Sequence, residues 1–193
     1  MSPATPAYPP SPAGAVWRAV YRLGFPLARL WWQLRRPEHR GALIAIHVDQ
    51  SVLLVRSSYR TAWNFPGGTV RRGEAPEAAA RRELVEEVGL VIEESLVLAG
   101  EARGMWDGRR DTVSFFALRL SGLPALRLDN REIVGARLVP LTEIRDLPLT
   151  GPVRSYVEAL AGRGRGEDWS APAGSAGLSH ETVFAGASQA DAV

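Results

Sequence analysis

The sequence of 193 residues contains no cysteine, and lysine is also absent, so all 23 basic residues are arginines. The absence of cysteine excludes disulfides, thiolate metal sites and cysteine nucleophiles, so a metal would have to be held by oxygen or histidine ligands. The 21 acidic residues leave a net charge of +2. This charge is too small to indicate nucleic-acid binding.

Long apolar runs and targeting signals are absent too. No stretch of about 18 consecutive apolar residues occurs, so a transmembrane helix is not expected. The first residues, MSPATPAYPPSPAGA, lack the charged start and the apolar run of a secretory signal. We therefore expect a cytoplasmic protein. Its hydrophobic fraction of 46% and charged fraction of 23% are typical of a globular protein with a sizeable core.

Both ends of the chain have the composition of disordered tails. Residues 1–13 are rich in proline, serine and alanine, and residues 162–193 are rich in glycine, alanine and serine without a sustained period. Such segments cannot bury enough apolar surface to order themselves. The sequence therefore predicts one domain over residues 41–161, preceded by a helical segment over residues 14–40.

Between the tails, strand patterns alternate with helix patterns. The runs GALIAIHV and SVLLVR, separated by residues 49–50, predict a hairpin of two buried strands. A helix is predicted over residues 75–88, with Pro76 in its first turn and Gly89 at its end. Further strands are predicted over residues 96–101, 112–120 and 132–141, a short helix over 142–147 and a closing helix over 151–161. This order favours an α/β domain in which helices cover a mixed sheet.

The segment GAVWRAVYRLGFPLARLWWQLRR is amphipathic and rich in tryptophan. Apolar side chains recur at steps of three or four residues, at Trp17, Val20, Tyr21, Leu27, Trp31 and Leu34. A basic stripe lies opposite much of that face, at Arg18, Arg22, Arg29 and Arg36. Gly24 and Pro26 are expected to divide the segment into two helices. Packing against the protein's own domain, or against a second subunit in a homodimer, is favoured over the alternative of contact with an anionic membrane surface.

The helix predicted over residues 75–88 carries a concentration of carboxylates. Glu83, Glu86 and Glu87 are spaced i, i+3 and i+4, so they lie on one side of the helix, while the apolar side chains point largely the other way. Each pair at about 5 Å repels by about 1 kcal/mol in water and about 3 kcal/mol at an effective dielectric near 20. Because charged helix faces are commonly just solvated, these three residues alone do not establish a site.

The residues around these glutamates resemble the signature of the Nudix hydrolases. That signature is a glycine, five residues, a glutamate, seven residues, and then R-E-aliphatic-x-E-E-x-G-aliphatic. In this sequence the matching positions are Gly68, Glu74, Arg82, Glu83, Leu84, Glu86, Glu87, Gly89 and Leu90. Every position fits, and the preceding WNFPGG resembles the segment that leads into the signature. The resemblance implies a Nudix-type α/β/α sandwich with a mixed sheet.

The resemblance also implies a site for Mg²⁺ or Mn²⁺, hard cations that prefer oxygen ligands. Glu86 and Glu87 match the principal ligands, and Glu83 matches a residue that ligates metal or serves as a base. The carbonyl of Gly68 is expected to join the metal shell. Two further residues match those that brace the loop and the helix: Glu74 and Arg82.

Three candidate residues lie outside the signature. A later carboxylate commonly completes a Nudix site, and we assign this role to Glu132, with Asp111 and Asp129 as competitors. Arg56, at a strand end, is assigned to phosphate binding, which a guanidinium can provide in bidentate form; an ordinary strand-end arginine is an equal alternative. Trp106, in a predicted loop, is assigned to substrate contact because loops over a sheet carry specificity.

The implied function is hydrolysis of a pyrophosphate bond in a nucleoside diphosphate linked to another moiety. Mg²⁺ or Mn²⁺ would be the cofactor, and Glu83 or Glu132 would activate the attacking water. The alternative is a Nudix domain that senses a nucleotide without hydrolysing it. An isomerase of the isopentenyl diphosphate type shares the scaffold but relies on a cysteine, which this chain lacks. The expected partner is a small nucleotide, and nucleic acid is not indicated except as a capped or triphosphorylated RNA end.

Overall fold

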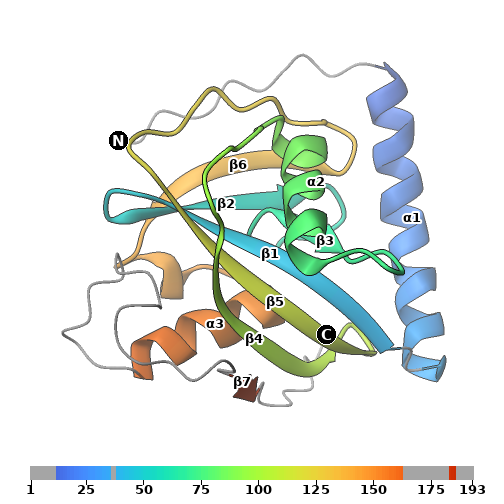
Figure 1. The fold of residues 1–193 in the computed structure, drawn as a ribbon. Helices are drawn as coiled ribbons and strands as arrows, with labels where there is room; N and C mark the ends of the chain where they lie inside the picture. The colour runs from blue at the N-terminus through green and yellow to red at the C-terminus, as the bar shows by residue number, and fades with distance from the viewer. Residues whose placement is uncertain (1–11, 36–37, 163–182, 186–193) are drawn as a thin grey trace.

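The computed structural model describes residues 12–35, 38–162 and 183–185 (Figure 1). The elements follow in the order α1 (Pro12–Arg35), β1 (Glu38–Val48), β2 (Ser51–Ser57), β3 (Gly67–Thr69), α2 (Pro76–Val88), β4 (Val97–Trp106), β5 (Arg109–Leu120), β6 (Ile133–Pro140), η1 (Ile144–Asp146), α3 (Gly151–Gly162) and β7 (Val183–Ala185). No helix in these ranges is both long and apolar enough to span a membrane. Most of the two segments predicted as tails lies outside the described residues; within the second, the structure describes the short strand β7.

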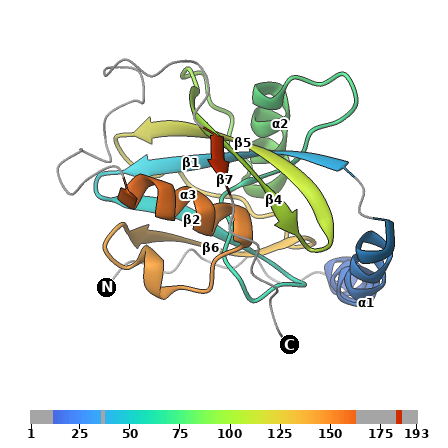
Figure 2. The same ribbon diagram turned by 90° about the horizontal axis from the view of Figure 1, so that it is seen from below.

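The strands form one mixed sheet in the order β6-β2-β1-β5-β4-β7, and β3 pairs with β1 outside this path. β1 and β2 form the predicted hairpin. β1 also runs parallel to β5, from the pair Glu38 and Arg110 to the pair Val48 and Leu120. α2 lies on one face of the sheet and α3 on the other (Figure 2). The predicted α/β sandwich with a mixed sheet and an N-terminal helical segment is therefore confirmed.

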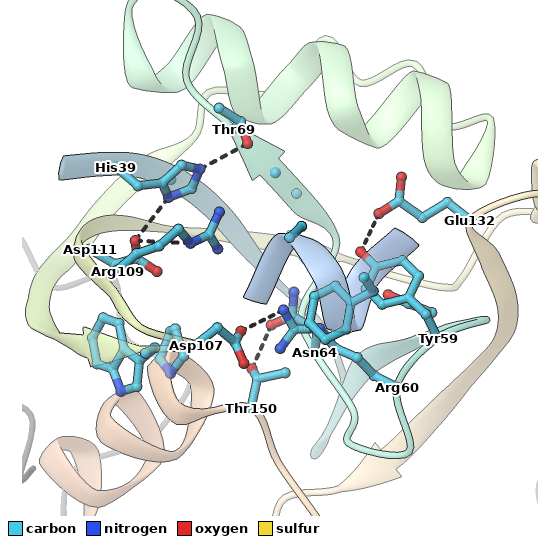
Figure 3. Close-up of a pocket in the computed structure, with 18 of the residues that line it drawn as sticks. His39, Tyr59, Arg60, Asn64, Thr69, Asp107, Arg109, Asp111, Glu132 and Thr150 are labelled. Carbon is cyan, nitrogen blue, oxygen red and sulfur yellow. Dashed lines mark hydrogen bonds and ion pairs between the residues drawn. The ribbon is translucent and has the colours of Figure 1, made fainter. Parts of the chain in front are cut away.

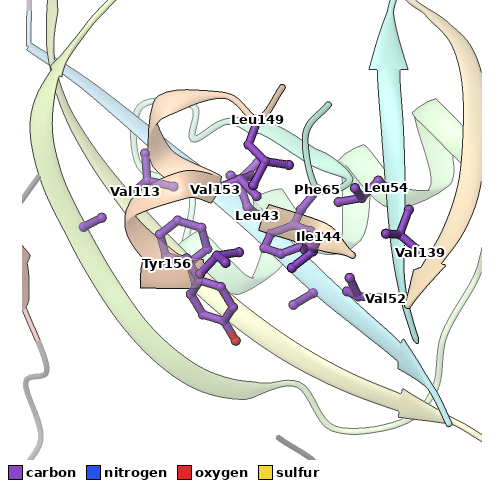
Figure 4. Close-up of a cluster of buried hydrophobic side chains, with 14 residues drawn as sticks. Leu43, Val52, Leu54, Phe65, Val113, Val139, Ile144, Leu149, Val153 and Tyr156 are labelled. Carbon is purple, nitrogen blue, oxygen red and sulfur yellow. The ribbon is translucent and has the colours of Figure 1, made fainter. Parts of the chain in front are cut away.

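The sheet is covered by apolar side chains on both faces, which explains the nearly unbroken apolar sequence of β1. On the α3 face, the rings of Phe65, Phe115 and Tyr156 pack with centroids 4.8–6.5 Å apart (Figure 4). On the other face, Leu84 and Val88 of α2 are fully buried in a second cluster. Because this side of α2 is fixed to the sheet, its carboxylates face away from the core.

Two parts of the sheet differ from the sequence-based expectation. The sequence does not predict β3, because two glycines after a proline are typical of a loop; pairing with residues 41–43 of β1 holds these residues as a strand. β4 and β5 are longer than predicted and meet at a tight turn, where Asp107 and Gly108 both have positive φ. Trp106 is therefore the last residue of a strand and not part of a loop.

The prediction that Gly24 and Pro26 divide the N-terminal segment is wrong, because α1 is one helix with Pro26 inside it. Proline removes one backbone hydrogen bond of the helix. Contacts with the domain on both sides of Pro26 offset this loss. Before it, the guanidinium of Arg22 donates to the carbonyl of Ser58 at 3.0 Å; after it, the ring of Trp32 packs against the guanidinium of Arg109 at 4.2 Å.

Candidate functional site

The loop between β3 and α2 brings backbone and carboxylates into direct contact. Gly67 is buried and has a φ of +134°, which favours glycine. Its backbone N–H donates a hydrogen bond of 2.9 Å to the carboxylate of Glu87. At Gly68, an added Cβ would lie only 2.7 Å from the carboxyl carbon of Glu83. The glycine pair therefore lets two carboxylates of α2 lie against the backbone of β3.

Arg82 connects the acidic residues of the signature to one another. Its guanidinium binds both oxygens of Glu74, at 2.9 and 3.1 Å. It also donates to Glu83 at 2.7 Å, to Glu86 at 3.3 Å and to the carbonyl of Thr69 at 3.0 Å. The hydrogen bonds from Arg82, together with the backbone N–H of Arg71, lower the pKa of Glu74 to about 2. This arrangement is what a bracing role for Glu74 and Arg82 requires.

The surroundings of Glu83 and Glu87 disfavour the charged form of both carboxyl groups. Burial raises the pKa of Glu87 well above its usual value, and the nearby charges of Glu132 and Glu83 raise it further, against the hydrogen bond from Gly67. Burial likewise raises the pKa of Glu83, although Arg82 opposes the shift. Raised carboxyl pKa values mean that the neighbourhood disfavours negative charge. A bound cation would reverse that preference.

The loop before β6 brings Glu132 near the carboxylate of Glu87. Asp129 accepts hydrogen bonds from the backbone N–H groups of residues 131, 132 and 133, at 2.8–3.2 Å, so this carboxylate fixes the loop. The hydroxyl of Tyr59 donates to Glu132 at 2.6 Å. Burial and the charge of Glu132 raise the pKa of Tyr59, which therefore keeps its proton.

A cavity of about 510 Å³ lies beside these groups (Figure 3). This volume falls in the range of small-molecule sites. Four of the predicted site residues line the cavity: Gly68, Glu87, Trp106 and Glu132. The other five are not among its lining residues: Arg56, Glu74, Arg82, Glu83 and Glu86. Arg56 lies on the exposed end of β2, with its guanidinium 5.3 Å from the ring centroid of Trp63, and its assignment to phosphate binding stays a prediction.

A second polar group in the cavity wall is not predicted as a unit by the sequence. His39 and Asp111 are paired residues of β1 and β5, and their Nδ1 and Oδ1 atoms lie 3.2 Å apart. The Nε of Arg109 lies 3.6 Å from the same oxygen. The other ring nitrogen of His39 is 2.9 Å from the hydroxyl of Thr69. Asp111 appears in the sequence as a candidate carboxylate, but only the parallel pairing of two distant strands brings His39 beside it.

The signature residues fit a divalent cation such as Mg²⁺, because they offer carboxylate and carbonyl oxygens where the surroundings disfavour the charged form of the carboxyl groups. No three acidic or histidine side chains of the described residues converge at the spacing of metal ligands. Arg82 and Gly67 hold the carboxylates by hydrogen bonds instead. Arg82 orients Glu83 and Glu86 through one oxygen of each, so the other oxygens could ligate a cation.

Arg82→Lys is expected to weaken the binding of Mg²⁺ to the protein by about 10- to 100-fold. A lysine ammonium lacks the planar fork that binds Glu74 and Glu83 together. The matched control is Arg81→Lys, since Arg81 pairs with Glu77 at 2.9 Å on another side of α2. Metal titrations of the two variants check the prediction, and identical metal dependence would contradict it.

Comparison with known proteins identifies the domain that carries these residues. A family model described as NUDIX domain matches residues 37–160. The chain is also similar to an RNA pyrophosphohydrolase of Caulobacter vibrioides, with 39% identity over 77 residues, which are 37% of this chain and 43% of that relative. The chain thus matches less than half of that relative's length.

Two solved structures share the fold. The MutT protein of Methanosarcina mazei Go1 superposes with a TM-score of 0.59 at 20% identity, covering 67% of this chain and 97% of that one. The MutT NUDIX hydrolase of Burkholderia pseudomallei gives a TM-score of 0.55 at 23% identity, covering 63% of this chain and 96% of that one. In both comparisons nearly the whole of the other chain is covered.

Proposed function

Because this chain belongs to the Nudix family, we propose that it is a metal-dependent pyrophosphohydrolase. Its substrate is a nucleoside diphosphate linked to another moiety, and the bond that it cleaves is the pyrophosphate bond. The position of Glu87 carries the proposal: this carboxylate is held by the N–H of Gly67 at 2.9 Å, and it lines the same cavity as Glu132. A carboxylate with a raised pKa in a cavity is typical of a functional site.

In this mechanism the residues of the signature position the diphosphate. Glu83, Glu86, Glu87 and the carbonyl of Gly68 would hold Mg²⁺ or Mn²⁺, whose chemistry is to neutralise charge that develops on the diphosphate oxygens. Glu83 and Glu132 are the two candidates to accept the proton of the attacking water. Tyr59 fixes one oxygen of Glu132, which orients that carboxylate, while Arg82 orients Glu83.

The test is a phosphate-release screen over nucleoside triphosphates, nucleotide sugars, dinucleoside polyphosphates and capped RNA, with Mg²⁺ and Mn²⁺. Triphosphorylated RNA ends belong in the screen because the similar Caulobacter protein is an RNA pyrophosphohydrolase. Metal-dependent release from at least one class is expected. Calorimetric binding of a nucleotide without any product would instead support the alternative, a domain that senses nucleotides.

Mg²⁺ is expected to stabilise the protein more at a pH of about 8 than at a pH of about 5. Glu83 and Glu87 have raised pKa values in the folded state, so the folded protein holds their protons more tightly than the unfolded chain does. Without metal, their contribution to stability is present below the unfolded pKa and is lost as the pH rises through the folded pKa. A cation binds the ionised carboxylates, so its effect grows over the same window.

Thermal unfolding with and without MgCl₂ at both pH values checks this prediction. At a Mg²⁺ concentration 100 times the dissociation constant, the stabilisation is about 2.7 kcal/mol. The Glu87→Gln variant serves as the control, because its pH dependence is expected to be weaker. An equal shift of the melting temperature at both pH values would contradict the assignment of these carboxylates to the metal.

We also propose that the outward face of α1 pairs with a second copy of the chain. Apolar side chains on this face recur at alternating steps of four and three residues and are 51–75% exposed: Val16, Val20, Leu23, Leu27, Leu30 and Leu34. This period is typical of helices that pack side by side. Three arginines of the predicted basic stripe instead contact the protein itself: Arg18, Arg22 and Arg29. Their engagement favours a homodimer over binding to an anionic membrane.

Substitution of both Leu23 and Leu30 by glutamate is expected to convert the dimer into a monomer, because it places like charges at the centre of the paired face. Light scattering measures the change, and Ala15→Glu is the control, because Ala15 is exposed on α1 but lies outside the apolar stripe. A monomeric wild type would contradict the proposal. So would flotation of the wild type with anionic vesicles that the double substitution abolishes.

A further inference from the structure

α1 lies outside the part of the chain that matches the Nudix family, yet it forms one wall of the cavity. The family match begins at residue 37, whereas α1 ends at Arg35. Half-buried side chains on its inner face recur at steps of three and four residues, at Arg18, Tyr21, Phe25, Ala28 and Trp32. Four of these five residues line the cavity together with Glu87 and Glu132. The cavity therefore combines an acidic end from the matched domain with a wall from a helix outside that domain.

Specific contacts fix this wall in place. Arg18 donates to the carbonyl of Asn130 at 2.8 Å, in the loop that carries Glu132. The ring centroid of Phe25 lies 4.7 Å from that of Tyr59, the residue that holds Glu132. The guanidinium of Arg60 lies 4.5 Å from the same ring of Phe25. α1 is thus joined directly to residues of the candidate site.

The other side of the cavity is lined by polar side chains that include both donors and acceptors. The His39, Asp111 and Arg109 group lies on one side and the Tyr59 and Glu132 pair on another (Figure 3). The Nδ1 of His39 and the Oδ1 of Asp111 are buried and face each other at 3.2 Å, and the Nε of Arg109 lies 3.6 Å from the same oxygen. The side chain of Asp111 is only 5% exposed. Because the group combines the donors of Arg109 with the acceptor oxygens of Asp111, it is suited to a ligand that brings both donors and acceptors.

An aromatic wall beside a mixed group of donors and acceptors matches the chemistry of a nucleobase. A base has a flat π-face, which packs favourably on aromatic side chains, and a polar edge that carries donors and acceptors. A sugar or a phosphate lacks the flat face. The metal end of the cavity would hold the diphosphate, so the base would lie further along the same cavity.

We propose that α1 forms the base-recognition wall of the site: the nucleobase of the substrate packs against Phe25 and its neighbours, with its edge toward Asp111 and Arg109. This inference rests on the proposed function for the place of the phosphates. Base recognition does not need metal or hydrolysis, so it can be measured separately. Substrate selection in this protein would then depend on a segment outside the family domain.

Gly24→Leu tests the wall without removing a contact. Gly24 lines the cavity, and a Cβ added there meets nothing within 4 Å, so leucine fits on the helix and fills space in the cavity. Leucine is also the better helix former. Ala19→Leu adds comparable bulk on an exposed side of the same helix and is the matched control. Phe25→Ala removes the aromatic surface itself.

The measurement is calorimetric binding of AMP, GMP, CMP and UMP, with ribose 5-phosphate as the probe that lacks a base. The wild type and Ala19→Leu are expected to bind at least one nucleotide about tenfold or more tightly than ribose 5-phosphate. Gly24→Leu and Phe25→Ala are expected to lose that difference.

Either of two results would overturn the proposal. One is a wild type that binds no nucleotide more tightly than ribose 5-phosphate; the other is a Gly24→Leu variant that keeps the full preference. A protein that shows base-dependent binding but releases no phosphate from any compound would refute the proposed hydrolase function and leave the wall intact. The two failures are therefore distinguishable.

Discussion

Glu87→Gln is expected to lower turnover by at least about 100-fold in saturating Mg²⁺ while leaving the fold intact. The substitution removes the negative charge that a metal ligand needs. It keeps an oxygen that can accept the hydrogen bond of 2.9 Å from the N–H of Gly67. Because Glu87 carries a raised pKa next to Glu132 and Glu83, loss of its charge also relieves repulsion, so the variant is not expected to unfold more easily.

Turnover at saturating substrate and metal, together with a thermal unfolding curve, checks this expectation. Glu77→Gln is the matched control, since Glu77 lies on the same helix but pairs with Arg81 at 2.9 Å. The control is expected to keep turnover within about twofold, because exposed ion pairs contribute little. Turnover near the wild-type value in Glu87→Gln would refute the assignment of the signature carboxylates to the site.

The elements that depend on local sequence could be predicted. α2 begins at Pro76, one residue after the predicted start, and ends at the predicted Val88. Proline suits the first turn, and Gly89 adopts the left-handed conformation that ends a helix, with a φ of +70°. The β1–β2 hairpin follows in the same way from two apolar runs and a short polar turn. The spacing of the glutamates on α2 likewise follows from helix geometry alone.

The features that depend on distant pairing could not be predicted. His39 and Asp111 are 72 positions apart in the sequence and become neighbours only because β1 and β5 pair in parallel. The face of α1 that packs on the domain is a second feature that could not be predicted. The sequence predicts the arginines on the side of the helix opposite the packed face. The guanidinium groups of Arg18 and Arg22 instead donate hydrogen bonds to backbone carbonyls of the domain. Amphipathic spacing identifies two faces of a helix but cannot decide which one a domain contacts when both carry apolar groups.

Gly67→Ala is expected to destabilise the protein by about 3 kcal/mol or more. This is the largest effect on folding stability among the predicted substitutions. The φ of +134° at Gly67 is one that L side chains rarely adopt, and strain of this kind costs about 1–3 kcal/mol. The added Cβ would also collide with the carbonyl oxygen of Ala42, on the strand that pairs with β3. Relief of that overlap requires movement of a central strand, at a further cost of about 1–3 kcal/mol.

Chemical denaturation measures the loss, and Gly73→Ala separates its two causes. Gly73 also has a positive φ, +79°, but an added Cβ there meets nothing within 4 Å, so only the backbone strain of about 1–2 kcal/mol remains. If the two variants lost equal stability, the close approach of β3 to β1 would not be what requires glycine. A larger loss at Gly67 would mean that the residue that donates to Glu87 also holds β3 against the sheet, so the site and the fold depend on the same backbone contact.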